Sequence, residues 1–455
     1  MSNESKMMLY DLDHHPPLKH NLVYGFQWLA FFLATIVAVP IVVGVSLDLD
    51  PHAMSTFIQR TFFFTGLLSI IQATLGHRLT ILEGPGGMWF SLIIIFSSLA
   101  PQLEKPISEI RTDLSFAMLI VAGLYIILGL TGTMGKIRHF FTPIVKGTFL
   151  LLMPILLSGN IVRGILGLEN GDTIEPRGII LALLVFILAI GISLRCRGFI
   201  QSVSLLIAMV FGWLAAIPLK LTNPPAVSGK GIIALPELFP WGIPTYDPGI
   251  TLASAFIGFL IFSNLIASIT TFFQLIGKED EKKVYNRTVI ITGFSNMIAG
   301  IAGVVGFIPF SATTGFVRLT RVASRLPFIT GGALLMLMGL FPSIGALYAS
   351  LPPQVGYAML TIVFCQLIGL GLQEYSQVKL DDRNTIIIGT ALLLGIGVML
   401  LPGEVMLMFP MIVRPLLGNG LIVGISTAIL MEHLVLREKI AYAVEKKAAY
   451  GKGSS

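Results

Sequence analysis

The stretch that decides the fold is Arg78 to Phe90, RLTILEGPGGMWF, together with its counterpart in the second half, Gly306 to Thr320, GFIPFSATTGFVRLT. Both lie between long apolar segments, yet both are interrupted by glycine and proline and carry polar side chains. Irregular chain at membrane depth survives only inside protein or beside a wet cavity, because unpaired backbone groups are costly in hydrocarbon. Two matching interruptions therefore predict a solute-binding site, although small residues alone also serve close helix packing.

The composition is that of a polytopic membrane protein. Of the 455 residues, 55% are hydrophobic and only 12% are charged, whereas soluble domains carry about 25% charged residues. The two cysteines, Cys196 and Cys365, are too few for a disulfide framework or a metal site. We expect no cofactor and no metal, and the lack of a catalytic cluster disfavours a membrane enzyme or sensor. We read the net charge of +6 as orienting the chain in a bilayer, not as binding nucleic acid.

Apolar segments of about 20 residues, the length of a membrane helix, occur fourteen times. They lie near 22–47, 54–76, 79–99, 115–134, 143–167, 178–195, 198–219, 249–277, 288–306, 308–324, 327–350, 354–372, 384–401 and 412–436. The longest polar gap divides them into two sets of seven. The sequence thus predicts a first repeat over 1–219, an extracellular connector over 220–247 and a second repeat over 248–455.

The distribution of basic residues predicts the orientation. With fourteen spans, 22 of the 30 Lys and Arg residues fall on the side of the chain termini and eight on the other. This bias places both termini in the cytoplasm of a cell (plasma) membrane protein. Because seven is odd, the second half enters the bilayer from the opposite side, so the two halves form an inverted repeat.

In this scheme the third and tenth spans are the interrupted ones. We expect a short extended piece in each, over Leu79–Glu83 and Ile308–Ala312, and the two pieces can pair antiparallel. Pro85 suits the first turn of the following helix, where its missing N–H is no loss. Thr313 or Ser311 is expected to cap the second helix. The predicted fold is an all-α membrane protein with these two short extended segments.

Several motifs resemble those of the nucleobase–ascorbate transporters, also called the uracil/xanthine permease family. The resemblance covers nearly the whole chain. It rests on the following motifs: Gly25-Phe26-Gln27-Trp28 through Pro40, Thr142-Pro143-Ile144-Val145-Lys146-Gly147-Thr148, Gly315-Phe316-Val317-Arg318-Leu319-Thr320-Arg321, Asp382-Arg383-Asn384 and Leu417-Gly418-Asn419-Gly420. It implies a nucleobase importer, with a core of spans 1–4 and 8–11 moving against a gate of spans 5–7 and 12–14, and it is compatible with a homodimer.

The chain departs from the family pattern at the expected site. Trp28 stands where the family has a His, and Asn264 stands where members usually carry a base-binding Glu in the eighth span. Ala312 and Thr313 replace the amide or carboxylate pair of the tenth span. Glu83, within Glu-Gly-Pro-Gly-Gly, resembles instead a divergent purine permease subgroup.

A nucleobase site needs a flat apolar surface and a few groups placed for bidentate hydrogen bonds. We expect Asn264 to supply an amide, with an interhelical hydrogen bond as its other role. We call the short helices that are expected to follow the two extended pieces the half-helices. Free backbone N–H groups at the ends of these half-helices are further candidates. One aromatic side chain at most is expected to stack on the substrate, from Phe26, Trp28, Trp89, Phe262 and Phe310. The predicted substrate-binding residues are Gln27, Glu83, Gly87, Asn264, Thr313, Thr314 and Gly315.

Glu83 is the one acidic residue that we place well inside a span, and it has two interpretations. It couples proton movement to transport, or it is a structural group held by half-helix N–H groups, Arg78 or Arg321. Arg318 and Arg321 fit cytoplasmic anchoring better than a role in pairing Glu83 or attracting an anion. The sequence predicts an importer of nucleobases, especially purines, by proton symport. The alternatives are an uncoupled facilitator and an anion transporter or channel of the same architecture.

Overall fold

The computed structural model of the chain describes residues 8–132, 142–168, 173–222, 231–278, 282–410 and 413–436. Residues 1–7 and 437–455, at the termini predicted to be cytoplasmic, and residues 223–230 of the predicted connector lie outside these ranges. We call the end of the helix bundle that contacts residues 231–247 the connector end.

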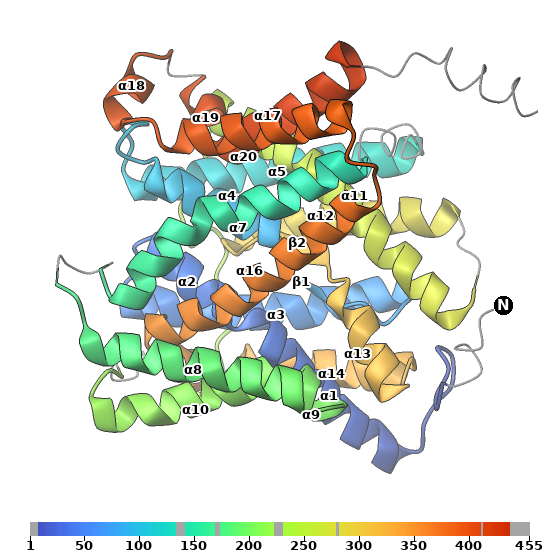
Figure 1. Cartoon of the computed structure of the whole chain (residues 1–455). Helices are drawn as coiled ribbons and strands as arrows, with labels where there is room; N and C mark the ends of the chain where they lie inside the picture. The colour runs from blue at the N-terminus through green and yellow to red at the C-terminus, as the bar shows by residue number, and fades with distance from the viewer. Residues whose placement is uncertain are drawn as a thin grey trace, which may run out of the picture.

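The first half of the chain supplies one short strand and a series of apolar helices (Figure 1). They are α1 (Leu18–Ile36), α2 (Ala38–Ser46), α3 (Pro51–Thr74), β1 (Glu83–Pro85), α4 (Gly87–Ser98), α5 (Ile107–Thr131), α7 (Pro143–Leu166), α8 (Pro176–Arg195), α9 (Phe199–Ser202) and α10 (Ser204–Leu219). Pro40 has no N–H to bond the carbonyl of Ile36, which accounts for the break between α1 and α2.

The second half repeats this pattern of long helices around one short strand. It comprises α11 (Pro248–Ile276), α12 (Lys282–Ala302), β2 (Phe307–Pro309), α13 (Ala312–Thr320), α14 (Arg325–Met338), α15 (Pro342–Ala349), α16 (Pro353–Ser376), α17 (Asp382–Met399), α18 (Gly403–Leu407), α19 (Arg414–Leu417), α20 (Gly420–Leu430) and a π-helical turn (Met431–Val435). Among the described residues, eight helices are long and apolar enough to cross a bilayer, and three shorter apolar helices accompany them. Every predicted span contains a helix, while the count of fourteen crossings stays a prediction.

The two interrupted segments meet in the middle of the molecule. β1 and β2 pair antiparallel, with Glu83 opposite Pro309, Gly84 opposite Ile308 and Pro85 opposite Phe307. The extended pieces therefore pair as expected, but they differ in extent from the predicted ranges. Pro85 lies in the strand and not in the first helical turn, because the backbone stays extended through Gly86 and α4 begins at Gly87.

The prediction that Thr313 or Ser311 caps the second half-helix, α13, is wrong, because neither side chain makes a capping hydrogen bond there. Ser311 occupies the N-cap position of α13 but makes no side-chain capping bond, because its backbone is already helical. Thr313 uses its hydroxyl elsewhere: its Oγ1 accepts a hydrogen bond from the N–H of Leu82 at 3.2 Å. Thr313 thus satisfies the backbone just before β1, across the two halves of the chain.

The predicted eleventh span is also not one straight helix. α14 and α15 meet at an angle of 85°. Pro342 begins α15, and the residue before a proline is kept out of the helical conformation, so Phe341 has extended backbone (φ −99°, ψ 109°). Proline and glycine at this junction therefore divide the predicted span.

Several motifs that carry the family resemblance are helix starts. Thr142 caps α7 by accepting from the N–H of Val145 (3.2 Å), Asp381 caps α17, and Asn419 caps α20. These short polar side chains satisfy N–H groups that the first helical turn leaves free. Their presence explains why polar motifs recur at the borders of apolar segments.

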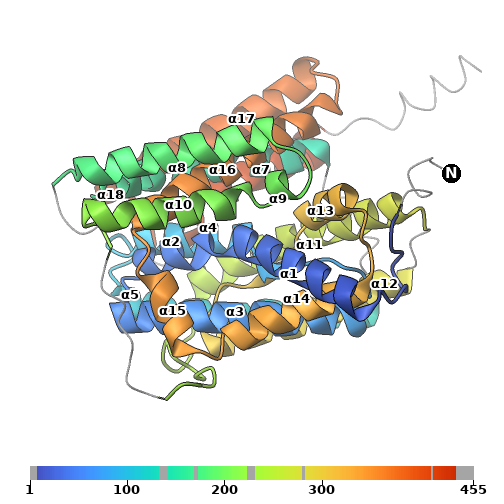
Figure 2. The ribbon, with the colours of Figure 1, turned by 90° about the horizontal axis from the view of Figure 1, so that it is seen from below.

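Helices pack in two groups, which Figure 2 shows as two layers. In one layer α1, α3, α5, α11, α12, α14 and α15 contact one another around the strand pair. In the other, α7, α8, α10, α16, α17 and α20 form their own set of helix contacts. The half-helices α4 and α13 lie where the two groups meet.

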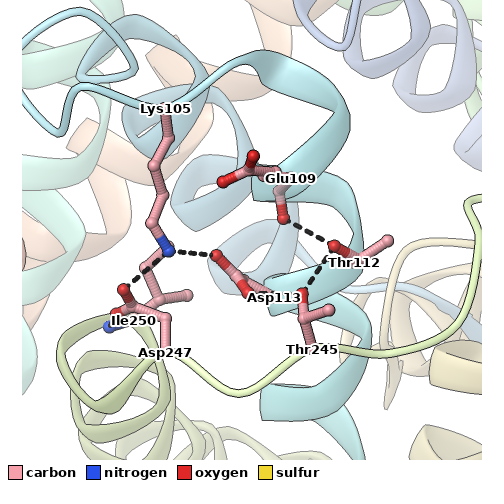
Figure 3. Close-up of polar contacts among 7 residues, drawn as sticks. All are labelled: Lys105, Glu109, Thr112, Asp113, Thr245, Asp247 and Ile250. Atoms are coloured by element: carbon pink, nitrogen blue, oxygen red, sulfur yellow. Dashed lines mark hydrogen bonds and ion pairs between the residues drawn. The ribbon is translucent and has the colours of Figure 1, made fainter.

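A buried ionic network holds the connector end together (Figure 3). Lys105 Nζ lies 2.6 Å from Asp113 Oδ2 and 2.7 Å from Asp247 Oδ2. Asp247 also caps α11 through the N–H of Ile250, and Thr245 donates to Asp113 Oδ1 at 2.6 Å. Because both carboxylates are largely buried and hydrogen-bonded, the network joins the loop after α4 to the starts of α5 and α11.

At the opposite end of the bundle, His77 lies in the turn between α3 and β1. Its Nδ1 accepts from the N–H of Leu79 at 2.9 Å, and the side chain is fully buried. Burial, together with the positive charges of Arg287 and Arg325, lowers the pKa of His77 to about 3. The folded protein therefore holds a neutral imidazole here.

This burial predicts a loss of stability in acid. Unfolded chain takes up a proton at His77 below the ordinary pKa of about 6.5, whereas the folded protein does not until about pH 3, so the stabilisation present above pH 6.5 is lost as the pH falls. At pH 5 the loss is about 2 kcal/mol. We expect the Tm of the wild type to fall more between pH 7.5 and pH 5 than that of His77→Gln. Equal falls in Tm would contradict the assignment, and His52→Gln, at an exposed site, is the control.

Candidate functional site

A cavity of about 480 Å³ lies between the two helix groups, beside the strand pair. One group contributes α1, α11 and the starts of α4 and α13, and the other contributes α7, α8, α10 and α16. The cavity extends toward the turn between α8 and α9, away from the connector end. Its size is that of a small-molecule site, for which about 300–1,000 Å³ is usual.

Three of the seven predicted binding residues line this cavity: Gly87, Asn264 and Gly315. Asn264 Nδ2 donates to the carbonyl of Pro309 in β2 at 3.4 Å, and Ser268 Oγ donates to the same carbonyl at 3.1 Å. Asn264 thus lines the cavity, as one predicted role requires, while its hydrogen bond goes to strand β2 and not to another helix. A Cβ atom at Gly315 would meet no atom within 4 Å.

The other predicted residues lie outside the cavity lining. Gln27 is one turn before Phe31 on α1, and it is the Phe31 side chain that lines the cavity. Thr313 is bonded to Leu82, as described above. Thr314 donates its N–H to the carbonyl of Ser311 at 3.0 Å, so this predicted free donor is engaged, while its buried hydroxyl has no hydrogen-bond partner in the described chain.

The first residues of each half-helix line the cavity. In α4, Gly87 and Met88 line the cavity, and in α13 Ser311 and Ala312 do so. The described hydrogen bonds include none from the N–H groups of these four residues, as expected for the first turn of a helix. Two positive helix ends therefore converge on one cavity.

Glu83, the first residue of β1, is fully buried and is not part of the cavity lining. Its N–H donates to Ser69 Oγ at 3.0 Å, but neither carboxylate oxygen has a hydrogen-bond partner within the described ranges. No described ion pair joins it to an arginine, and Arg318 and Arg321 are both exposed. A buried carboxylate without a partner is costly when ionised.

The structure adds cavity residues that were not singled out from the sequence. Gln366 on α16 is an exposed amide on the side of the cavity formed by α7, α8, α10 and α16, and Thr35 on α1 lies on the other side. Gln366 could have been identified from the sequence, because it is a lone Gln within the apolar segment 355–372. Thr35 gives no such signal, because its hydroxyl bonds the carbonyl of Phe31, as threonines in membrane helices often do.

Aromatic rings supply the apolar part of the cavity. Of the five rings considered from the sequence, Phe310 lines it, Phe26 is exposed on the outer surface, and the other three are buried in the core away from it. Phe31 and Phe316, which also line the cavity, stack with ring centroids 4.3 Å apart. None of the described lining residues carries a charged side chain.

Comparison with known proteins identifies the family. The family model for xanthine/uracil permeases, described as "Permease family", matches residues 19–404. The chain belongs to this permease family. It is a transporter and not an enzyme, and it is a multi-pass membrane protein.

Relatives match the permease over nearly its full length. "Putative purine permease YwdJ" of Bacillus subtilis (strain 168) is 30% identical over 91% of this chain and 96% of that protein. "Uric acid permease PucJ" and "Xanthine permease" of the same organism are 26% and 24% identical, over 91% and 94% of this chain and 92% and 94% of their own lengths.

Solved structures confirm the architecture of the permease. The transmembrane domain of a cyanobacterium bicarbonate transporter, BicA, matches with a TM-score of 0.64 at 16% identity, covering 92% of this chain and 99% of that one. The murine anion transporter Slc26a9 matches with a TM-score of 0.64 at 12% identity, covering 95% of this chain and 69% of that one. The predicted helical membrane fold, of the same class as these seven-plus-seven transporters, is thereby confirmed, while the exact number of spans stays a prediction.

Proposed function

We propose that this permease imports purine nucleobases through the cavity between its two helix groups. The observation that carries the proposal is the lining: aromatic faces, neutral amides and hydroxyls, and the N–H groups of two half-helices, without a charged side chain. Such a surface suits a flat, uncharged ring with hydrogen-bonding edges. The names of the relatives, which specify purine, uric acid and xanthine, support the same substrate class.

Movement of one helix group against the other is the proposed transport step. The group with α1, α3, α5 and α11 to α15 corresponds to the predicted core, and the group with α7, α8, α10 and α16 to α20 to the predicted gate. A cavity lined by both groups supports this division, because relative movement would open and close it. With both termini in the cytoplasm, as the basic loops predict, the cavity extends toward the inner side of the plasma membrane.

The homodimer stays a prediction of the family resemblance, testable by native mass spectrometry.

Glu83 is the proposed proton-coupling residue. It pairs with Pro309 across the strands, and the carbonyl of Pro309 accepts from Asn264, so a change at Glu83 is transmitted to the cavity through one strand pair. Without a partner, the carboxyl group in this conformation suits the protonated form, and release of the proton requires a rearrangement that admits water or a donor. This places proton release on the step that reorients the core.

A solute screen tests the proposal directly. The purified protein is measured by thermal shift and by uptake into proteoliposomes with hypoxanthine, xanthine, uric acid, adenine, uracil, bicarbonate and sulfate. We expect stabilisation and uptake with purines. Stabilisation and uptake by bicarbonate or sulfate alone would instead establish an anion transporter, which the similar fold of BicA makes a specific alternative.

Asn264→Ala is expected to weaken binding of the best purine by roughly 1 to 3 kcal/mol, because a substrate edge loses its amide partner. The dissociation constant is measured by isothermal titration. The matched control is Ser268→Ala, which removes the second hydrogen bond to Pro309 without removing a cavity group. Equal weakening in both variants would make Asn264 a structural residue that supports β2.

A further inference from the structure

Arg60 is a buried cation that the proposed transport mechanism does not use. It lies nine residues beyond the start of α3, about 14 Å along the helix axis. Its side chain is 3% exposed, and its Nε and Nη1 have no acceptor in the part of the chain that is described. An arginine inside a span is costly and points to a partner.

A small cavity of about 40 Å³ borders Arg60 at the connector end. α3 contributes His52, Thr56 and Gln59, the connector contributes Ala234 to Glu237, and the bend between α14 and α15 contributes Gly339 and Pro342. A single water needs on the order of 10–15 Å³ in this measure, so the space holds a few waters or one small ion. We call this 40 Å³ space the second cavity. It is distinct from the 480 Å³ cavity, because the two share no lining residue.

The charges around this second cavity favour an anion. Arg60 is its one buried charge, while Glu237 and His52 are exposed side chains at its border. Glu237 makes no ion pair with Arg60 within 4 Å. A guanidinium presents parallel N–H donors, which suit a halide or a planar oxyanion of similar size.

We propose that Arg60 and the second cavity form a binding site for one small monovalent anion, a halide or an ion the size of nitrate. The anion neutralises the guanidinium and sits where the connector meets the bend between α14 and α15. These two segments are already joined by the N–H of Ala234, which donates to the carbonyl of Leu340 at 2.9 Å. Occupancy therefore stabilises the contact between the connector and the bend at the connector end of the protein.

The test uses purified full-length protein in detergent, with sodium gluconate replaced stepwise by sodium chloride, bromide, nitrate or sulfate at constant ionic strength. We expect a saturable rise of Tm with chloride, bromide and nitrate and none with sulfate. Arg60→Gln is expected to raise the half-saturating concentration by about tenfold or more, since the charge that holds the anion is lost. Arg163→Gln, which removes an exposed arginine at the end of α7, is the matched control and should respond like the wild type.

Glu237→Gln keeps the proposal testable if Arg60→Gln does not fold. Removal of the carboxylate near the cavity should lower the half-saturating chloride concentration by about threefold, because a like charge no longer opposes the anion. The proposal is overturned if neither the wild type nor Glu237→Gln shows a saturable halide effect, or if Arg60→Gln responds like the wild type. It is also overturned if Glu237→Gln loses stability at every salt composition, which would make Glu237 the partner of Arg60. Stabilisation by phosphatidylglycerol vesicles without any halide effect would assign the site to a lipid headgroup.

Discussion

Gly315→Phe is expected to abolish nucleobase uptake while the protein stays folded. Gly315 lines the 480 Å³ cavity, and a Cβ built on it meets no atom within 4 Å, so a benzyl group enters the cavity and not the packed core. The substrate then loses the space between the two helix groups. We expect the initial rate of uptake of radiolabelled purine to fall by about 100-fold or more, as when a required binding surface is blocked.

The control for this substitution is Gly191→Phe in α8. A Cβ at Gly191 also meets no atom within 4 Å, but this residue does not line the cavity. It should therefore transport like the wild type, with both variants matched for the amount of protein in the membrane and for Tm. Wild-type uptake by Gly315→Phe would show that the solute takes another route.

Glu83→Gln is expected to separate binding from accumulation. The amide keeps the size of the side chain and cannot exchange a proton, so the strand pair and the Asn264 contact remain while proton coupling is lost. In proteoliposomes with an imposed pH gradient, the variant should equilibrate purine to the outside concentration and no further. Wild type should accumulate it.

Exchange of labelled for unlabelled purine should persist in Glu83→Gln, because exchange requires binding and movement of the loaded protein only. Glu404→Gln changes an exposed carboxylate on α18 and serves as the control. Accumulation in Glu83→Gln at the wild-type level would remove Glu83 from the coupling role and leave it as a structural group. Wild-type protein that does not respond to the pH gradient would indicate an uncoupled facilitator.

The sequence predicted the strand pair because its signal is local. Glycine and proline interrupt two apolar segments at equivalent places, and a bilayer does not tolerate such backbone unless another segment satisfies it. The exact residues of β1 and the N-terminus of α4 were not predicted, because Pro85 is equally compatible with the end of a strand and with a first helical turn. Only the partner strand decides between the two.

Which polar side chains line the cavity could not be predicted reliably from the sequence. Gln27 and Thr313 carry polar groups at positions suggested by the family resemblance, yet Gln27 does not line the cavity and Thr313 bonds the backbone of Leu82. Gln366 lies on the opposite helix group, far along the chain, and faces the same cavity as Asn264. Which polar residues of distant helices share one space depends on how those helices pack.

By itself the sequence determined the membrane fold and its internal repeat, since apolar length, interrupted segments and the distribution of Lys and Arg are properties of the chain read in order. Only the tertiary structure decided that Glu83 is buried within the strand pair and does not line the cavity, and that Arg60 borders a second cavity at the connector end. The physical reason is that burial and partnership of a charged group depend on the segments that pack against it, and here those segments include parts of the chain that are distant in sequence, such as β2 and the bend between α14 and α15.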